Sequence, residues 1–265
     1  ARIVEGPNGP QLHRGKDEAK DQSYVLAIMG PQELPRVIFP LGEAPSKAWV
    51  RSEAERMGLG VSNKPDSYDI CFIPDGDTQG FLKSHLGSKP GEIVDTDGQV
   101  VGRHEGYWNF TVGQRRGLNL GNPAADGRPR YVVETRPETN QVIVGASELL
   151  SVDRITCSEI VWLAGDDPGE VDDAATHAFG ASIGERSLGE VDERVLTAQI
   201  RAHGIPSVVT ALQRFGVDEG KLELSLALPI RGVAAGQSMV LYRGTRVIAE
   251  ATIERAHRGE GSAAS

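Results

Sequence analysis

The sequence predicts a mixed fold that becomes richer in short β-strands toward its end. Hydrophobic residues make up 39% and charged residues 25% of the chain, which is enough apolar material for real cores and excludes a wholly disordered protein. The 32 glycines and 15 prolines, set against 5% aromatic residues, predict many turns and short elements. A length of 265 residues favours roughly two domains.

The first segment, residues 1–88, is expected to consist mainly of helices and loops. Ser46 is followed by apolar residues at helical spacing and then by Gly58, a pattern that predicts an N-capped helix closed by a glycine. Asp77 and Thr78 are suitable caps for a second helix. The other elements expected here are a short helix over 32–38, a strand-like stretch over 68–73 and the end of the second helix at Leu86.

The second segment, residues 89–148, is predicted to be β-rich. Two short apolar runs, 91–94 and 99–102, flank an Asp-Thr-Asp-Gly turn and predict a hairpin. A second hairpin is expected from residues 130–135 and 141–145, joined across a polar stretch that contains Pro137. Both hairpins would contribute to one small domain.

The third segment, residues 149–256, predicts a closed barrel. Leu222, Leu224 and Leu226 alternate with polar residues, so the three leucines share one face of a strand. Six antiparallel strands at short spacing are typical of a small barrel. The expected strands are 153–163, 194–203, 205–214, 221–227, 238–242 and 245–253. The polar tail, residues 257–265, is expected to be flexible.

The charge is distributed unevenly along the chain. A net charge of −9 argues, taken alone, against a nucleic-acid partner, because such proteins usually carry basic surfaces. Residues 164–194 hold nine acids and two arginines, so this stretch carries −7 and the other 234 residues only −2. We expect it to be a solvated, mobile insertion that aids solubility. Residues 101–130, by contrast, have an excess of +3. Their basic residues are Arg103, Arg115, Arg116, Arg128 and Arg130.

Several classes of protein are excluded or disfavoured by the sequence. No run of about eighteen apolar residues predicts a membrane span. The first residues lack the layout of a signal peptide, so we expect a cytoplasmic protein with reduced thiols. The histidines show no metal-binding spacing, and the chain has neither a GxxxxGK[ST] phosphate loop nor a GxSxG elbow. No metal site is therefore predicted.

The two cysteines lie too far apart in sequence to suggest a disulfide framework or a metal knuckle. Cys157 falls in an apolar strand, where cysteine commonly serves as a small buried residue. Cys71 lies at the edge of a loop that contains proline, glycine and acidic residues. Nearby acids would raise its pKa, so composition leaves both burial and reactivity open for Cys71.

An ordered series of short motifs resembles the tRNA-specific 2-thiouridylases, and the resemblance extends from Arg2 to about Ile253. The motifs are Lys20-Asp21-Gln22-Ser23-Tyr24, Phe39-Pro40-Leu41-Gly42-Glu43, Asp66-Ser67-Tyr68-Asp69-Ile70-Cys71-Phe72-Ile73, Pro90-Gly91-Glu92-Ile93-Val94, Thr111-Val112-Gly113-Gln114-Arg115-Arg116-Gly117-Leu118, Tyr131-Val132-Val133 and Ala235-Gly236-Gln237-Ser238. Each is weak alone, whereas their order is specific. The acidic insertion departs from the family, as does Ala202, which follows Arg201 where the family often has an aromatic residue.

The resemblance implies a fold and a chemistry. Residues 1–88 would be the remnant of an α/β PP-loop domain (adenine nucleotide alpha hydrolase-like), and the chain would lack most of the N-terminal ATP-pyrophosphatase domain, with its Ser-Gly-Gly-rich ATP loop and a first catalytic cysteine. In the family, ATP, with Mg²⁺, adenylates the 2-oxygen of the wobble uridine, and a persulfide sulfur then attacks the activated carbon. Cys71 matches the cysteine that carries this persulfide.

The resemblance also implies which residues contact tRNA. Lys20, Asp21 and Gln22 match one tRNA-binding stretch, in which lysine suits phosphate while Asp and Gln suit sugar hydroxyls or base edges. The matching C-terminal positions are Arg201, Ala202 and Gln237. From the local charge we add Arg103, Arg115 and Arg116 as possible phosphate contacts. The implied partners are tRNA and a sulfur-carrier protein, and we expect a monomer.

Alternative functions remain open at this point. The chain alone is expected to be inactive, because it has no ATP loop and lacks the first cysteine. It could therefore act as a non-catalytic tRNA-binding module. A tRNA methyltransferase, an older label for the family, gains no support because no methyl-donor-binding glycine motif is present.

Overall fold

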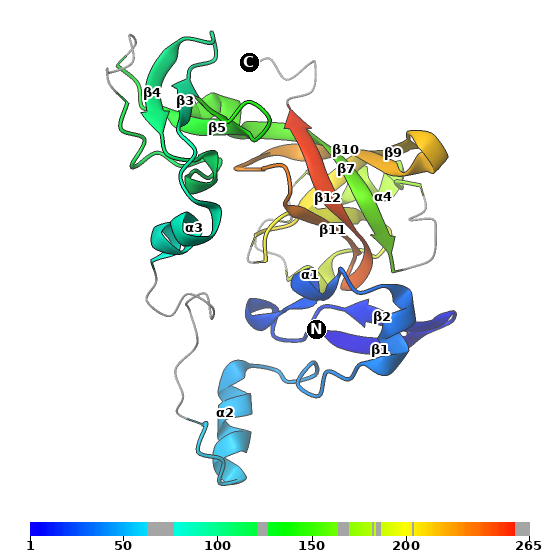
Figure 1. Ribbon diagram of the computed structural model, residues 1–265. Coiled ribbons are helices and arrows are strands. Elements are labelled where there is room, and N and C mark those ends of the chain that lie inside the picture. The colour runs from blue at the N-terminus through cyan, green and yellow to red at the C-terminus, as the bar shows by residue number, and fades with distance from the viewer. Residues whose placement is uncertain are drawn as a thin grey trace. The chain divides into compact units, whose positions relative to one another are not determined.

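The computed structural model describes residues 1–62, 77–120, 127–163, 170–181, 183, 187–202 and 204–257. The chain divides into two compact units (Figure 1). The barrel unit comprises Ala1–Lys64, Asp153–Pro229 and Ala235–Ser265, and the central unit comprises Pro65–Val152 and Ile230–Ala234. Among the described residues, no helix is long and apolar enough to span a membrane.

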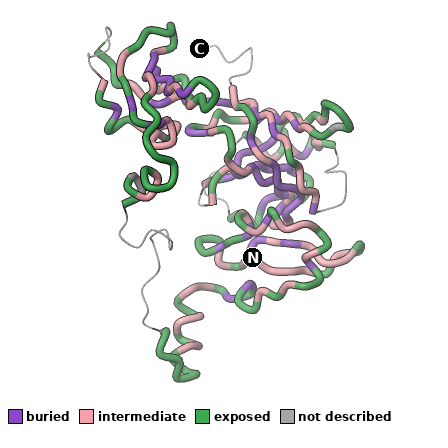
Figure 2. The backbone as a smooth tube through the Cα atoms, viewed as in Figure 1, coloured by how far each residue is buried: buried purple, intermediate pink, exposed green. Residues whose placement is uncertain are grey.

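The barrel unit contains the predicted six-stranded antiparallel barrel. Its strands follow the order β12-β11-β8-β9-β10-β7, and a pairing between β12 and β7 closes the sheet. The strands are β7 (Ser151–Trp162), β8 (Leu196–Gln199), β9 (Ser207–Phe215), β10 (Lys221–Arg231), β11 (Ser238–Arg243) and β12 (Arg246–His257). Buried residues concentrate in this barrel (Figure 2). The prediction of the barrel is confirmed.

Alternating side chains fill the barrel interior. Leu222 and Leu224 have no exposed surface and Leu226 is 6% exposed, as the alternation along β10 predicts. Met239 and Leu241 on β11 are also fully buried. Burial of one such side chain contributes about 1.5–3 kcal/mol to folding. The barrel is therefore a packed core rather than a ligand cavity.

Some boundaries of the barrel strands differ from prediction, among them the end of β10, which continues to Arg231 rather than ending at 227. Strand β8 ends at Gln199, whereas the sequence suggested a strand over 194–203. The chain turns after Gln199, and the amide of Gly204 donates to the carbonyl oxygen of Arg201 at 3.0 Å. At the other end, β12 extends through His257, which the sequence placed in the tail. Residues 258–265 lie outside the described residues.

The first residues form a β-hairpin that sequence reasoning missed. Strands β1 (Arg2–Gly6) and β2 (Gly9–His13) pair antiparallel across a Pro7-Asn8 turn, and β2 joins the barrel sheet where His13 pairs with Arg246. Gly9 has a φ of +109°, a conformation that favours glycine. The Pro-Asn-Gly sequence was the available turn signal.

His13 at the end of β2 makes the stability of the chain depend on pH. Burial, followed by the charges of Arg2 and Arg246, lowers its pKa from 6.5 to about 4. Below pH 6.5 the unfolded chain takes up a proton that the folded chain refuses, so stability is lost as pH falls from 6.5 toward 4. We expect about 2 kcal/mol of loss from this residue, discounted for its partial exposure.

Urea unfolding at pH 7 and pH 4.5 tests the expected loss against a His13→Gln variant. The variant should show a shallower fall in the free energy of unfolding than the wild type, since glutamine does not titrate. Equal falls in the two proteins would contradict the role of His13.

A second apolar cluster attaches the first segment to the outside of the barrel. Leu12 and Leu34 are buried against Tyr242 and Val247, which belong to β11 and β12. Leu26, Met29 and Phe39 pack against the same cluster and are partly buried. The first segment is thus held by apolar contacts as well as by the β2–β12 pairing.

The helices of the first segment largely follow prediction. Ser46 caps α2 (Lys47–Arg56), accepting a hydrogen bond from the amide of Trp49 at 3.1 Å, and Gly58 follows with a φ of +70°. The helix expected over 32–38 is instead a 3₁₀ helix, Pro31–Arg36, which contains Pro35. A proline there removes a donor that an α-helix needs. The other short elements are α1 (Ser23–Leu26) and 3₁₀ turns at Glu18–Lys20, Leu188–Glu190 and Val217–Glu219. The strand-like stretch 68–73 lies outside the described residues.

The central unit is a four-stranded sheet in the order β4-β3-β6-β5. Both predicted hairpins are confirmed, and β3 and β6 pair in parallel to join them. Ile93, Val132 and Val142 lie in its buried core. The elements are α3 (Thr78–Leu86), which Asp77 caps as predicted, β3 (Gly91–Val94), β4 (Val100–His104), β5 (Tyr131–Arg136), β6 (Gln141–Gly145) and 3₁₀ turns at Tyr107–Asn109 and Ser147–Leu150.

The acidic stretch is partly folded, which corrects the prediction of a solvated, mobile insertion. Its residues 173–179 form α4 (Asp173–Phe179), and the carboxylate of Asp172 caps the helix by accepting from the amide of Ala175 at 2.8 Å. Ala175 and Ile183 are buried in a cluster with Val208 of β9. The apolar residues among the acids therefore anchor the described part of this stretch to the barrel.

Candidate nucleic-acid interface

The structure places the three predicted tRNA-binding segments on the barrel unit. Lys20 ends the first 3₁₀ turn, and Asp21 and Gln22 lead from it to α1. Arg201 and Ala202 lie in the turn after β8, and Gln237 precedes β11. The side chains of Lys20, Gln22 and Arg201 are exposed. Nearly 180 residues separate Lys20–Gln22 from Arg201 and Ala202 in the sequence, so the distance between them in the folded chain depends on tertiary contacts.

Asp21 points into the protein and organises the loop around it. Its Oδ1 accepts hydrogen bonds from the amides of Gly15 at 2.8 Å and Ser23 at 3.2 Å, and its Oδ2 accepts from the Ser23 hydroxyl at 2.5 Å. Burial alone would raise the pKa of Asp21, but the hydrogen bonds from Ser23 and Gly15 outweigh it and hold the pKa below its ordinary value. The carboxylate is therefore a charged, buried acceptor.

Arg14 lies beside Asp21 and is 2% exposed. Its Nη1 is 3.7 Å from Asp21 Oδ2, and its guanidinium carbon is 3.5 Å from the ring centroid of Tyr242. Its Nη2 donates to Gln199 Oε1 at 2.8 Å. A buried guanidinium is stable only with such partners, because removal from water penalises its charge.

Gln199 continues the network to Arg201 and Ala202, the second of the predicted tRNA-binding segments. It is 3% exposed, and its Nε2 donates to the carbonyl oxygens of Arg201 at 2.7 Å and Ala202 at 3.1 Å. The amide of Gln199 thus holds the turn after β8, while its oxygen is bound to Arg14. Arg14 is in turn paired with Asp21, which belongs to Lys20–Gln22.

Tyr24 connects the loop of Lys20–Gln22 to the region of Gln237. Its hydroxyl donates to the carbonyl oxygen of Ser238 at 2.7 Å, next to Gln237. Burial, followed by the charge of Glu250, raises the pKa of Tyr24, and the positive charge of Arg201 opposes this shift. The three predicted segments converge on one region, which we call the binding face: Lys20–Gln22, Arg201–Ala202 and Gln237.

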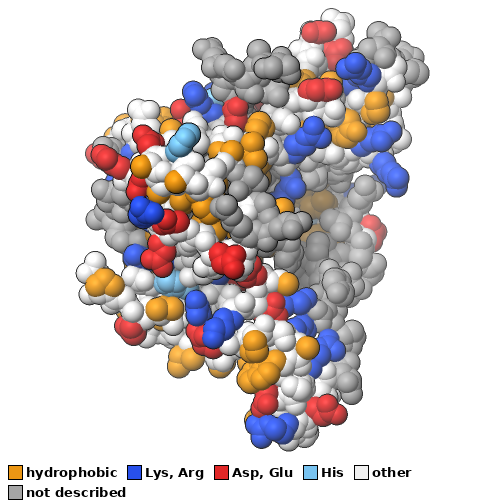
Figure 3. All heavy atoms as spheres, turned by 180° about the vertical axis from the view of Figure 1, so that it is seen from behind, with side chains coloured by type: hydrophobic (Ala, Val, Ile, Leu, Met, Phe, Trp, Pro, Cys, Tyr) orange, Lys and Arg blue, Asp and Glu red, His pale blue; other side chains and the backbone are white. Residues whose placement is uncertain are grey.

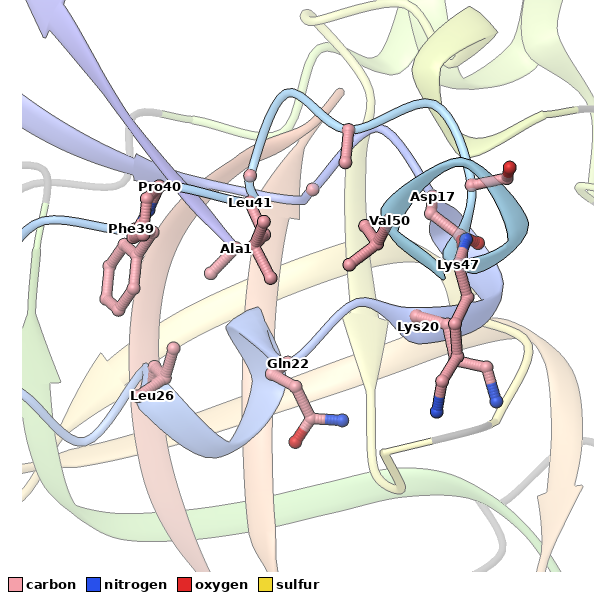
Figure 4. Close-up of a pocket in the computed structure, with 14 residues that line it drawn as sticks. Ala1, Asp17, Lys20, Gln22, Leu26, Phe39, Pro40, Leu41, Lys47 and Val50 are labelled. Atoms are coloured by element: carbon pink, nitrogen blue, oxygen red, sulfur yellow. The ribbon is translucent and has the colours of Figure 1, made fainter. Parts of the chain in front are cut away.

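A pocket of about 490 Å³ adjoins Lys20 and Gln22 (Figure 4). Leu26, Phe39 and other apolar residues form its wall, and Lys47 contributes a second lysine that sequence reasoning missed. Figure 4 shows the two ammonium groups and the amide of Gln22 pointing to the same side. Two cations beside an apolar wall suit a nucleotide, which has both a phosphate and an aromatic base.

Lys47 is positioned by Asp17, an acidic residue 30 positions earlier in the chain. Its backbone amide donates to Asp17 Oδ2 at 2.8 Å, which fixes the first turn of α2 beside residues 18–20. In the sequence Lys47 is simply the first residue of an N-capped helix. Only the fold brings it to the binding face.

The predicted phosphate contacts of the central unit are exposed. Arg103 lies on β4, and Arg115 and Arg116 lie in the turn that follows Gly113. Figure 3 shows Lys and Arg side chains on one face of this unit. Arg103 and Lys83 also line a pocket of about 530 Å³ within it. The local positive charge predicted from sequence is thus available at the surface.

The structure describes only one of the two cysteines. Cys71, predicted to carry the persulfide, lies outside the described residues. Cys157 on β7 has no exposed surface, and burial raises its pKa to about 12. It therefore stays a protonated thiol at neutral pH, as its predicted structural role requires. Among the described residues, no group of three or more His, Cys, Asp or Glu could hold a metal ion.

Comparisons with known proteins match the whole chain. Three family models match in succession: "tRNA methyl transferase HUP domain" over residues 1–75, "tRNA methyl transferase PRC-barrel domain" over 79–146 and "Aminomethyltransferase beta-barrel domain" over 186–253. The first match agrees with the expected remnant of a nucleotide-binding α/β domain.

The similar curated proteins share one description, "tRNA-specific 2-thiouridylase MnmA". The protein from Beutenbergia cavernae is 52% identical over 100% of this chain and 64% of its own length. Those from Kocuria rhizophila and Arthrobacter sp. are each 49% identical, over 97% and 96% of this chain, and again over 64% of their own lengths. The chain thus spans less than two thirds of these relatives. It belongs to the tRNA-specific 2-thiouridylase family.

Proposed function

We propose that this chain provides the tRNA-binding face and the sulfur-carrying cysteine of a tRNA 2-thiouridylase. The observation that carries the proposal is the convergence of Lys20–Gln22, Arg201–Ala202 and Gln237 through hydrogen bonds between distant parts of the chain. A shared surface is what a single RNA ligand needs. The name of the relatives supports the same reaction.

The residues of the binding face have distinct roles in this proposal. Lys20 and Arg201 pair with backbone phosphates, and Gln22 and Gln237 hydrogen-bond sugars or base edges. Ala202 supplies no aromatic ring, so stacking on that position is absent. Asp21, being buried, acts by shaping the loop that presents Lys20 and Gln22. Arg103, Arg115 and Arg116 add phosphate contacts from the central unit.

In the proposed sulfur transfer, Cys71 holds the sulfur as a persulfide received from a sulfur-carrier protein. ATP, when bound, supplies the activation of the uridine 2-oxygen. The terminal sulfur forms the new bond to C2 as the activated oxygen leaves, and the S–S bond to Cys71 must then break. A second thiolate attacks the Cys71 sulfur, so a disulfide forms there as the transferred sulfur leaves with the uridine, and a cellular thiol reductant then restores Cys71. Cys157 does not supply this second thiol, because it is buried and protonated.

We also propose that these 265 residues do not complete the reaction alone. No Ser-Gly-Gly-rich ATP loop is present in the sequence. Incubation with a tRNA transcript, ATP, Mg²⁺ and a persulfide donor should therefore give a tRNA complex without 2-thiouridine. Formation of 2-thiouridine would contradict the need for further residues. A chain that binds no tRNA would contradict the binding face.

The parent function is tested in the cells that encode the chain. We expect deletion of the gene to remove 2-thiouridine from the wobble position of tRNA, and reintroduction of the native gene to restore it, as measured by mass spectrometry of digested tRNA. Persistence of 2-thiouridine after deletion would overturn the thiouridylase and favour a non-catalytic tRNA-binding module. Loss of a methylated nucleoside instead would favour a methyltransferase.

Three further features belong to the same proposal. The protein works in the cytoplasm, accepts sulfur from a carrier protein and is a monomer in solution. Light scattering of the purified chain should give a mass near 28.4 kDa. A mass twice that value would contradict the monomer.

A further inference from the structure

A buried polar network connects two segments of the binding face that are far apart in sequence. Arg14 and Gln199, separated by 185 residues, are joined by a hydrogen bond of 2.8 Å. Arg14 leads to Asp21 and hence to Lys20–Gln22, while Gln199 leads to the carbonyl oxygens of Arg201 and Ala202. The connecting side chains Arg14, Asp21 and Gln199 are all buried.

Both the oxygen and the nitrogen of the Gln199 side-chain amide form hydrogen bonds. Its oxygen accepts from Arg14, and its nitrogen donates to two successive carbonyl oxygens in the turn after β8. Arg201 O also accepts from the amide of Gly204, so this turn is closed by two donors. The Gln199 amide is itself buried, so the two hydrogen bonds that it donates are shielded from water and hold the turn in one conformation.

We propose that Gln199 is a positioning residue that, through Arg14, fixes Arg201 relative to Lys20–Gln22 for tRNA binding. This inference rests on the proposed function. Gln199 does not need to touch RNA, because it acts through the backbone of Arg201 and Ala202. Its partner Arg14 is held on the other side by Asp21 and by the face of Tyr242.

The location of the polar network explains why a link between Lys20–Gln22 and Arg201–Ala202 is needed. Arg14, Asp21, Gln199 and Ala202 all line a pocket of about 540 Å³ between the two segments. Ile205 on the rim of this pocket is 78% exposed. Both segments line this pocket, and the buried polar network is the hydrogen-bonded link between them.

Two variants separate the donor function of Gln199 from its charge and volume. Gln199→Glu keeps an acceptor for Arg14 and removes the donors to Arg201 and Ala202, whereas Gln199→Met removes all hydrogen bonds without adding charge. Gln213→Glu on the exposed surface of β9 is the matched control for an added negative charge. All three should fold, which circular dichroism checks.

Hydrogen exchange of the chain without RNA tests the positioning directly. In both Gln199 variants we expect the amide of Gly204 to exchange at least about tenfold faster, because its acceptor Arg201 O is no longer held in place. The amides of β11 and β12 should be unchanged, and Gln213→Glu should match the wild type. Unchanged exchange at Gly204 would overturn the proposal.

A double-mutant cycle tests the connection to tRNA. We expect Gln199→Glu and Arg201→Ala each to weaken tRNA binding about five- to tenfold, and the double variant to be no weaker than Arg201→Ala alone. In a double variant with Lys20→Ala, the loss of tRNA affinity caused by Gln199→Glu should instead multiply with the loss caused by Lys20→Ala. Gln199→Met should weaken binding as much as Gln199→Glu does.

The outcomes distinguish this inference from the proposed function. Multiplicative losses for Gln199→Glu with Arg201→Ala would show that Gln199 does not act through Arg201 and would overturn the inference. If Arg201→Ala leaves binding unchanged, or the wild-type chain binds no tRNA, the binding face itself fails. The exchange rate of Gly204 then decides alone whether Gln199 holds the turn.

Discussion

Replacing Cys71 by serine should reduce wobble 2-thiouridine in tRNA to the level of a gene deletion. A serine hydroxyl cannot hold sulfur as a persulfide, so the proposed sulfur transfer loses its donor atom. The change is made in the chromosomal gene, and nucleosides from purified tRNA are measured by mass spectrometry. Retained 2-thiouridine would remove Cys71 from the mechanism.

Cys157→Ala is the matched control for this prediction. Cys157 is fully buried in β7 and its pKa is raised to about 12, so its thiol has no part in the proposed chemistry. Cells with this variant should keep 2-thiouridine. The Cys71→Ser protein should also bind tRNA as the wild type does, because the binding face consists of other residues. Loss of binding would show that the substitution acts on the fold.

Asp21→Ala should lower the free energy of unfolding by about 3–5 kcal/mol, the range for removing one partner of a buried ion pair. The substitution leaves the guanidinium of Arg14 buried without its carboxylate and removes the acceptor for Ser23 and for the amide of Gly15. Urea unfolding monitored by circular dichroism measures the change. Asp21→Asn, which keeps one acceptor oxygen, should lose less.

Glu43→Ala is the surface control for this prediction. Glu43 forms ion pairs with Arg2 at 2.9 Å and Lys16 at 3.2 Å, but its side chain is 61% exposed. Water screens such pairs, so the unfolding midpoint should stay within experimental error of the wild type. A midpoint for Asp21→Ala as high as that of Glu43→Ala would contradict the structural role of Asp21.

Local patterns were sufficient to predict the barrel and the helix ends. The alternating leucines of β10 and the caps at Ser46 and Asp77 depend on neighbours within a few residues, and the structure confirms them. The hairpin of β1 and β2 was missed although its Pro-Asn-Gly turn was visible. Its strands are stabilised by pairing with β12, more than 230 residues away, which no local pattern reveals.

The site was less accessible to sequence reasoning than the fold. Lys20-Asp21-Gln22 resembles a surface loop, and nothing in those three letters shows that the middle residue is buried. The direction of Asp21 is set by its hydrogen bonds from Gly15 and Ser23 and by Arg14. Lys47 reaches the binding face only because the fold places the start of α2 beside it. The acidic stretch was predicted to be a mobile insertion for a similar reason, because its tertiary contacts are not visible in the sequence. Its few apolar residues, such as Ile183, find partners on the barrel.

The distribution of charge matters more for the partner than the net charge of −9. Acidic residues of the 164–194 stretch account for most of that value, whereas Lys20, Lys47 and Arg201 lie at or beside the binding face. Phosphate contacts depend on cations at the contact surface, and their number sets the salt dependence of binding. The acidic pI of 5.2 therefore does not argue against tRNA.

The most direct test of the binding face is the affinity of the chain for tRNA as a function of salt. We compare the wild type with a Lys20→Ala, Arg201→Ala double variant in fluorescence titrations. The account predicts that the variant binds about a hundredfold more weakly, and that the slope of log K against log salt is shallower by about two, one for each lost phosphate contact. Equal affinities and equal slopes for the two proteins would contradict a tRNA-binding face at these residues.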